Sequence, residues 1–115
     1  MQRLNDFDQL PALHLRLLNN ALRLVRPGGV VVFSTCTLDR AQNDEVLRAS
    51  DAMDEEKFRV LDLNCVAKAT KEWFFFCDPR DLVGEDSSLG STIVPSKGKS
   101  WGPMFISAIQ KLPVS

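Results

Sequence analysis

The sequence has few of the residues that build metal centres and disulfide scaffolds. Its 115 residues include one histidine and three cysteines. The sequence contains no Cys-x-x-Cys pair, which is the spacing of many zinc ligands and of dithiol redox sites. We therefore expect neither a metal site nor a disulfide framework, and a reducing compartment fits this cysteine usage better.

Long apolar runs and an excess of charge are also missing. No apolar run approaches the ~20 residues that a membrane-spanning helix needs, so we expect no membrane partner. Fourteen basic and fifteen acidic residues give a net charge of −1, which is not typical of a nucleic-acid-binding surface, although a local basic patch could still bind RNA. Residues 1–9 have neither a signal peptide's apolar segment nor a transit peptide's Arg-rich character.

What is present is typical of an ordinary globular protein. Apolar residues make up 44% of the chain and charged residues 25%. A chain of 115 residues suits one small domain or a piece of a larger one. We find no internal repeat and no domain boundary.

A helix is expected from Leu10 to Val25, because apolar residues recur there at intervals of three and four. Its expected buried stripe consists of Leu10, Leu13, Leu17, Ala21 and Leu24. Further apolar residues widen this stripe, and they are Leu18, Leu22 and Val25. Pro27 ends the helix, and Gly28 and Gly29 permit a sharp turn.

A cysteine-containing polar segment follows the turn and the next strand. The continuous apolar run Val30 to Phe33 predicts a strand that is buried on both faces, as in a parallel sheet. The residues after it are Ser34, Thr35, Cys36 and Thr37. Open α/β sheets carry out chemistry at the carboxyl ends of their strands. Cys36 is therefore a candidate reactive residue, and the alternative is a buried structural thiol.

The remaining elements are predicted from shorter patterns. Asp39 with Gln42 three residues later resembles a capping box, which predicts a second helix from near Arg40. Charged residues 54–57 predict a solvated loop. Strands are expected at 58–63 and 104–109, and a strand or packed loop at 73–77. Gly, Ser and Asp predict a long loop over 81–100, with a short strand around Ile93 and Val94.

These residues together resemble a family of RNA-modifying enzymes. The Pro-Gly-Gly turn before a Val-rich strand resembles the back half of class I methyltransferase domains. Residues 33–38 (Phe-Ser-Thr-Cys-Thr-Leu) and 42–46 (Gln-Asn-Asp-Glu-Val) are similar to the motif around the nucleophilic cysteine of the RsmB/Sun family of RNA cytosine-5 methyltransferases. Residues 101–105 (Trp-Gly-Pro-Met-Phe) resemble the entry to that family's last strand. The branch that methylates mitochondrial ribosomal RNA is the most similar.

The resemblance implies both a fold and a reaction. Residues 1–115 would be a partial methyltransferase domain, the carboxyl-terminal part of a Rossmann-like α/β sheet that is mixed, mostly parallel and antiparallel at its last strand. Cys36 would be the nucleophile, with Ser34, Thr35 and Thr37 as its supporting loop. S-adenosyl-L-methionine would be the cofactor, and ribosomal or transfer RNA the substrate. A protein partner for RNA targeting is possible, and the mitochondrion is the expected compartment, with the nucleus, nucleolus or cytoplasm as alternatives.

Several family features have no counterpart in the sequence. They are the glycine-rich cofactor turn, the acidic residues that bind the ribose and adenine, and the Asp-Pro-Cys segment. We therefore expect the cofactor-binding residues upstream and the isolated chain to be inactive. The competing hypothesis is a truncated, non-catalytic module that binds RNA or protein through an exposed apolar edge.

The other candidate residues are expected to be structural. Cys65 and Cys77 are predicted to be buried thiols, and His14 a packed or surface residue of the first helix. The aromatic residues 73–76 could stack on RNA bases, but core packing is the simpler interpretation. Three lysines could meet phosphates but are expected to be solvated, namely Lys97, Lys99 and Lys111.

Overall fold

The computed structural model describes residues 2–37, 39–69, 75–77, 89–94 and 103–113, and of these it describes residues 2–9, 75–77 and 94 by backbone alone. The elements in chain order are α1 (Gln2–Leu24), β1 (Val30–Thr35), η1 (Arg40–Gln42), α2 (Asp44–Ala49), η2 (Asp51–Met53), β2 (Phe58–Val60), α3 (Asn64–Ala69), β3 (Phe75–Cys77), β4 (Ser91–Val94) and β5 (Met104–Lys111). None of the helices in these stretches combines the length and apolar character that a membrane span requires.

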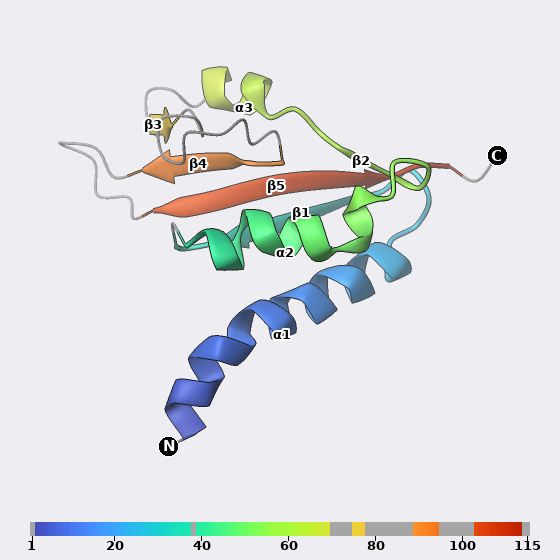
Figure 1. Ribbon diagram of the computed structural model, residues 1–115. Coiled ribbons are helices and arrows are strands. Elements are labelled where there is room, and N and C mark those ends of the chain that lie inside the picture. Colours follow the sequence, from blue (N-terminus) through green and yellow to red (C-terminus); the bar gives the residue numbers. More distant parts are fainter. Residues whose placement is uncertain (1, 38, 70–74, 78–88, 95–102, 114–115) are drawn as a thin grey trace.

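The strands form one sheet around β5, the longest strand. Their order is β1-β5-β4-β3, and β2 also pairs with β5. α1 and α2 lie on one side of the sheet and α3 on the other (Figure 1). The α/β class and the antiparallel last strand are therefore confirmed. The described strand pairs are all antiparallel. β1, β2 and β4 run in one direction, and β5 runs in the opposite direction between β1 on one edge and β2 and β4 on the other.

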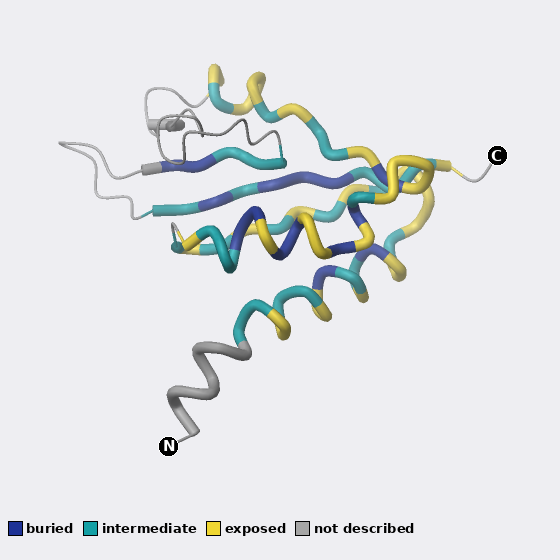
Figure 2. Tube along the Cα trace, viewed as in Figure 1, coloured by how far each residue is buried: buried dark blue, intermediate teal, exposed yellow. Residues whose placement is uncertain are grey.

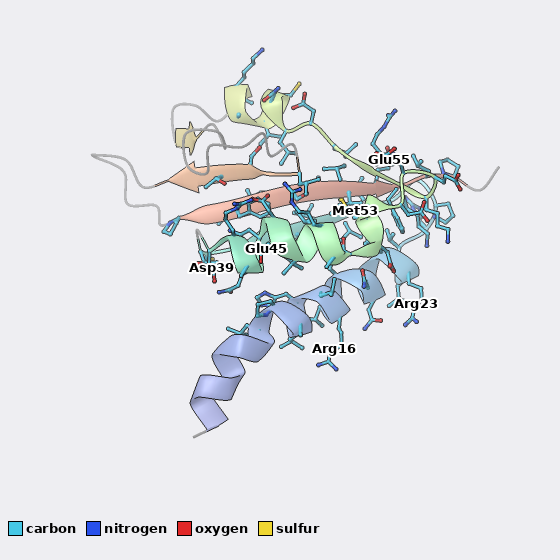
Figure 3. All side chains as sticks on the ribbon, in the orientation of Figure 1. Arg16, Arg23, Asp39, Glu45, Met53 and Glu55 are labelled. Carbon is cyan, nitrogen blue, oxygen red and sulfur yellow. The ribbon has the colours of Figure 1, made fainter. Side chains whose placement is uncertain are left out.

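The first helix is longer than predicted. α1 runs from Gln2 to Leu24 and includes Pro11, whereas the apolar spacing predicted a helix over 10–25. The outward side of the helix agrees with the prediction, because Arg16 and Arg23 are exposed and project away from the sheet (Figure 3).

The buried face of α1 is only one side of the stripe that we expected. Leu18 and Leu22 are 3% and 0% exposed and belong to the core, whereas the exposed leucines are Leu13, Leu17 and Leu24. Both sets have helical spacing, so periodicity alone could not choose between them. The helix buries the set that packs beside α2, and the side of α1 that faces away from the sheet is exposed (Figure 2). The other two residues of the expected stripe, Leu10 and Ala21, are half-buried.

The predicted turn after α1 is confirmed and is tied to the far end of β5. Gly28 has a φ of 86°, a conformation that glycine adopts at little cost. Its N–H donates to the Lys111 carbonyl at 2.7 Å, and the Lys111 N–H donates to the Gly29 carbonyl at 2.9 Å. The Lys111 ammonium donates to the carbonyls of Arg23 and Val25 at 3.0 and 3.1 Å. Lys111 therefore caps the end of α1, which corrects its expected role as a solvated lysine.

β1 is covered on one face, not on both. Val31 and Phe33 pack against the core, while Val30 and Val32 are 46% and 65% exposed. One edge of β1 pairs with β5, and no other described strand pairs with its second edge. The apolar run 30–33 has the composition of a strand that is buried on both faces, but the described residues bury only the face that carries Val31 and Phe33.

The later elements follow the prediction in part. The charged residues 54–57 are exposed, as expected. β2 is shorter than the strand expected at 58–63, and β5 is longer than the one expected at 104–109. β4 contains the short strand that was predicted around Ile93 and Val94. The sequence patterns did not predict α3, which begins where the Asn64 N–H donates to the Asp62 carboxylate at 2.9 Å. Cys65 on α3 is exposed, so its expected burial was wrong.

Some predictions lie outside the described side chains. They concern the side chains of Cys77 and of the aromatic residues 73–76, the two lysines Lys97 and Lys99, and most of the loop 81–100.

Candidate active site

Cys36 is an exposed free thiol directly after β1. The residue before it, Thr35, is the last residue of the strand and pairs with Phe105 of β5. Phe105 is 2% exposed, so the strand end that carries the thiol is anchored in the core. The alternative of a buried structural thiol is therefore wrong for Cys36.

The residues on either side of Cys36 are held by hydrogen bonds. The Thr35 hydroxyl donates to the side-chain oxygen of Asn43. The Asn43 side-chain nitrogen donates to the Thr37 carbonyl at 2.9 Å, and the Asp39 N–H donates to the Thr37 hydroxyl at 3.1 Å. Thr35 and Thr37 are thus both tied to residues 39–43 by hydrogen bonds, whereas Ser34 is exposed on the same face of β1 as Val30 and Val32.

Asp39 caps a turn as predicted, but the reciprocal bond of a capping box is not formed, because the Asp39 N–H donates to Thr37, and the element that Asp39 begins is short. The Asp39 carboxylate accepts the Ala41 N–H at 3.0 Å and the Gln42 side-chain N–H at 3.1 Å. The capped turn is the 3-10 helix η1, and the six-residue α2 begins only at Asp44. Asp39 lies close to the amino-terminal end of α2 (Figure 3). The expected α-helix from near Arg40 is therefore corrected to a 3-10 turn followed by α2.

Arg40 of this turn forms an ion pair with Asp44 of α2. The Arg40 Nε is 3.9 Å from a carboxylate oxygen of Asp44, and Asp44 is 7% exposed. The pair is one helical turn apart, a spacing that brings two side chains together on a helix surface. Among the described residues, no three His, Cys, Asp or Glu side chains gather as metal ligands.

A groove of about 270 Å³ opens beside the thiol loop, between α1 and β1. β1 contributes residues 31–35 to its lining, and α1 contributes His14, Leu17, Leu18 and Ala21. The His14 Nδ1 is buried and has no hydrogen-bond partner among the described atoms. The lining is mostly aliphatic and contains no carboxylate, so it does not fit the hydroxyl-rich ribose of S-adenosylmethionine.

Asn43 is the site residue whose role the sequence reasoning missed. It belongs to the motif 42–46, but a single asparagine near a helix start is usually a cap or a surface residue. In the structure it is 3% exposed and bonds to both neighbours of Cys36. A polar residue four positions after the capping Asp39 was the one available signal.

Comparisons with known proteins agree on one family. The model of the family described as 16S rRNA methyltransferase RsmB/F matches residues 1–108. The mitochondrial tRNA (cytosine(34)-C(5))-methyltransferase of Mus musculus is 33% identical over 109 residues, which are 95% of this chain and 29% of the relative. The 5-cytosine rRNA methyltransferase NSUN4 of Xenopus laevis is 33% identical over 114 residues, covering 96% of this chain and 26% of the relative.

A solved structure shows the same fold. The crystal structure of a methyltransferase homologue protein from Pyrococcus horikoshii matches with a TM-score of 0.66 and 25% identity, over 94% of this chain and 33% of that chain. The chain thus spans about a third or less of the length of these relatives. The described sheet corresponds to part of a methyltransferase fold, as the sequence predicted.

Proposed function

Because this chain belongs to the 16S rRNA methyltransferase RsmB/F family, we propose that it is the catalytic-cysteine part of an enzyme that methylates C5 of cytosine in RNA. The two longer relatives described above are named as RNA cytosine-5 methyltransferases. The observation that carries the proposal for this chain is the exposed Cys36 at the end of β1, with an anchored threonine on each side.

The proposed role of Cys36 is covalent catalysis. C5 of cytosine is a weak nucleophile, so a methyl group does not transfer to it readily. When the Cys36 thiolate adds to C6, a C6–S bond forms and the electrons of the C5–C6 double bond make C5 nucleophilic. Those electrons then form the new bond from C5 to the methyl group. When a base removes the C5 proton, the electrons of the C5–H bond restore the C5–C6 double bond, and the C6–S bond breaks with its electron pair returning to the Cys36 sulfur as thiolate. One difficult step is thereby divided into easier ones.

The methyl donor is proposed to be S-adenosylmethionine, bound by residues outside this chain. The groove beside the thiol loop does not fit that cofactor, because its lining is mostly aliphatic and has no carboxylate for the ribose. We therefore assign this chain only the thiol and its positioning, and no step of donor binding.

Ribosomal RNA is the proposed substrate class, and transfer RNA is the alternative. The family description and the NSUN4 relatives support ribosomal RNA. A relative of equal identity acts on transfer RNA, so identity alone does not favour either class. The mitochondrion is the proposed compartment because that relative is mitochondrial. A protein partner that targets the RNA stays a prediction from the resemblance.

Covalent trapping on RNA tests the proposed reaction. The full-length enzyme that carries this chain is incubated with S-adenosylmethionine and an RNA substrate that contains 5-fluorocytosine. Fluorine at C5 cannot leave as a proton, so the C6–S bond persists and a denaturation-resistant adduct accumulates. We expect the adduct with the wild-type enzyme and none with Cys36→Ser.

The matched control is Cys65→Ser, which removes the other described exposed thiol. We expect this variant to form the adduct at the wild-type rate. An undiminished adduct in Cys36→Ser would refute the assignment.

The second candidate function is a non-catalytic binding module. The exposed apolar side chains of Leu17 and Val32, on either side of the groove, favour it because such surfaces often bind a partner. This candidate predicts RNA or protein binding by the wild-type chain with no adduct in any variant.

A further inference from the structure

Both neighbours of Cys36 are bonded to one buried side chain. Asn43 is 3% exposed and lies between η1 and α2. Its side-chain oxygen accepts from the Thr35 hydroxyl, and its side-chain nitrogen donates to the Thr37 carbonyl at 2.9 Å. The same carboxamide therefore holds the chain immediately before and immediately after the thiol.

The orientation of this carboxamide is fixed by its partners. The Thr37 carbonyl can only accept a hydrogen bond, so the nitrogen of Asn43 must face it. The Thr35 hydroxyl, which can donate or accept, then donates to the oxygen. A reversed amide would place two acceptors, its oxygen and the Thr37 carbonyl, against each other. Only an asparagine-like side chain meets both partners from this position.

The backbone of Asn43 is held as firmly as its side chain. Its N–H donates to the Arg40 carbonyl at 3.1 Å, and its carbonyl accepts the Leu47 N–H at 3.2 Å. Leu47 is 0% exposed and belongs to the core. The carboxamide is therefore attached to a part of the backbone that is bonded on both sides and anchored in the core.

We infer that Asn43 is a positioning residue for the Cys36 thiol, through its paired hydrogen bonds to Thr35 and Thr37. The inference rests on the proposed nucleophilic role of Cys36. A nucleophile must reach its target atom with a defined distance and direction, and anchoring both sides of the residue limits the directions that the thiol samples. Asn43 does not need to touch the RNA, since its side chain is buried.

Two nearly isosteric variants and one rescue variant test this role. Asn43→Asp keeps the acceptor for Thr35 but replaces the donor that faces Thr37. Thr35→Val removes the hydroxyl and keeps the side-chain volume, which guards against a failure of Asn43→Asp to fold. Thr35→Ser keeps the hydroxyl and is the rescue variant.

The first readout is steady-state methyl transfer by the full-length enzyme. One lost hydrogen bond corresponds to a factor of roughly 2 to 12. We expect kcat to fall by a factor in this range in Thr35→Val and by at least as much in Asn43→Asp, where a carboxylate oxygen faces the Thr37 carbonyl, with KM for RNA unchanged in both. Thr35→Ser should retain the wild-type kcat. A change in KM alone, or equal losses in Thr35→Ser and Thr35→Val, would overturn the positioning role.

The second readout does not depend on the reaction. In the 115-residue chain, the {¹H}–¹⁵N heteronuclear NOE of the Cys36 and Thr37 amides should fall in Asn43→Asp and Thr35→Val and be retained in Thr35→Ser. Unchanged NOE values in both altered variants would contradict the inference even if wild-type enzyme traps RNA. If the wild-type enzyme forms no adduct, the proposed function fails, and the NOE comparison alone decides whether Asn43 orders the loop.

Discussion

Two leucines on the same helix should differ greatly in their contribution to stability. Leu22 is 0% exposed, and Leu17 is 57% exposed, although the sequence pattern predicted Leu17 as part of the buried stripe. Leu22→Ala and Leu17→Ala remove the same atoms and change helix propensity equally. Any difference between them therefore reports burial.

The expected magnitudes follow from the two exposures. Truncation of a fully buried leucine costs about 2–5 kcal/mol, because the lost transfer free energy and the cavity add. Full burial of a leucine side chain is worth roughly 1.5–3 kcal/mol. Less than half of Leu17 is covered, so Leu17→Ala should cost about 1 kcal/mol or less.

Urea unfolding of the 115-residue chain, followed by circular dichroism at 222 nm, measures this difference. With a slope of about 1.5 kcal/mol/M, Leu22→Ala should lower the midpoint by about 2 M and Leu17→Ala by less than about 0.7 M. Equal shifts, or a larger shift for Leu17→Ala, would refute the assignment of the buried face of α1.

Two further predictions concern the turn and the open edge of the sheet. Lys111→Met removes the ammonium that donates to the Arg23 and Val25 carbonyls, so it should destabilise the chain by about 1 kcal/mol and speed amide exchange in the last turn of α1. Unchanged exchange there would show that the ammonium does not cap the helix. The 115-residue chain should self-associate with increasing concentration, because Val32 is 65% exposed on a strand whose second edge has no described partner. Light scattering after gel filtration should show less association for Val32→Lys, and a wild-type chain that stays monomeric would contradict this expectation.

Local features of the chain were predictable from the sequence. The turn at Gly28 and Gly29 follows from residue types that act over a few positions, and the structure confirms it. The capping contact of Asp39 is equally local, because its partners lie two and three residues away. The exposed thiol of Cys36 followed from the polar segment after an apolar strand.

Features that depend on distant residues were not predictable. α1 carries apolar residues around much of its circumference. Packing beside α2 decides that Leu18 and Leu22 are buried while Leu13 and Leu17 are exposed, although all four of these leucines were expected on the buried side. The apolar run of β1 indicates cover on both faces, but the described residues supply it on one.

The role of Asn43 also depends on tertiary structure. Its partner Thr35 is eight residues away in sequence, on a strand. No pattern of propensity or periodicity brings these two side chains together, so the support of the thiol loop became visible only in three dimensions.

The position of the covalent bond to RNA tests the account most directly. The 5-fluorocytosine adduct of the full-length enzyme is digested with nuclease and trypsin, and the modified peptide is sequenced by tandem mass spectrometry. Tryptic cleavage after Arg23 and Arg40 gives a peptide of residues 24–40, in which Cys36 is the single cysteine. We predict that the nucleotide mass lies on Cys36. A nucleotide on the peptide that carries Cys65 or Cys77, or on a residue outside this chain, would contradict the assignment of Cys36 as the nucleophile.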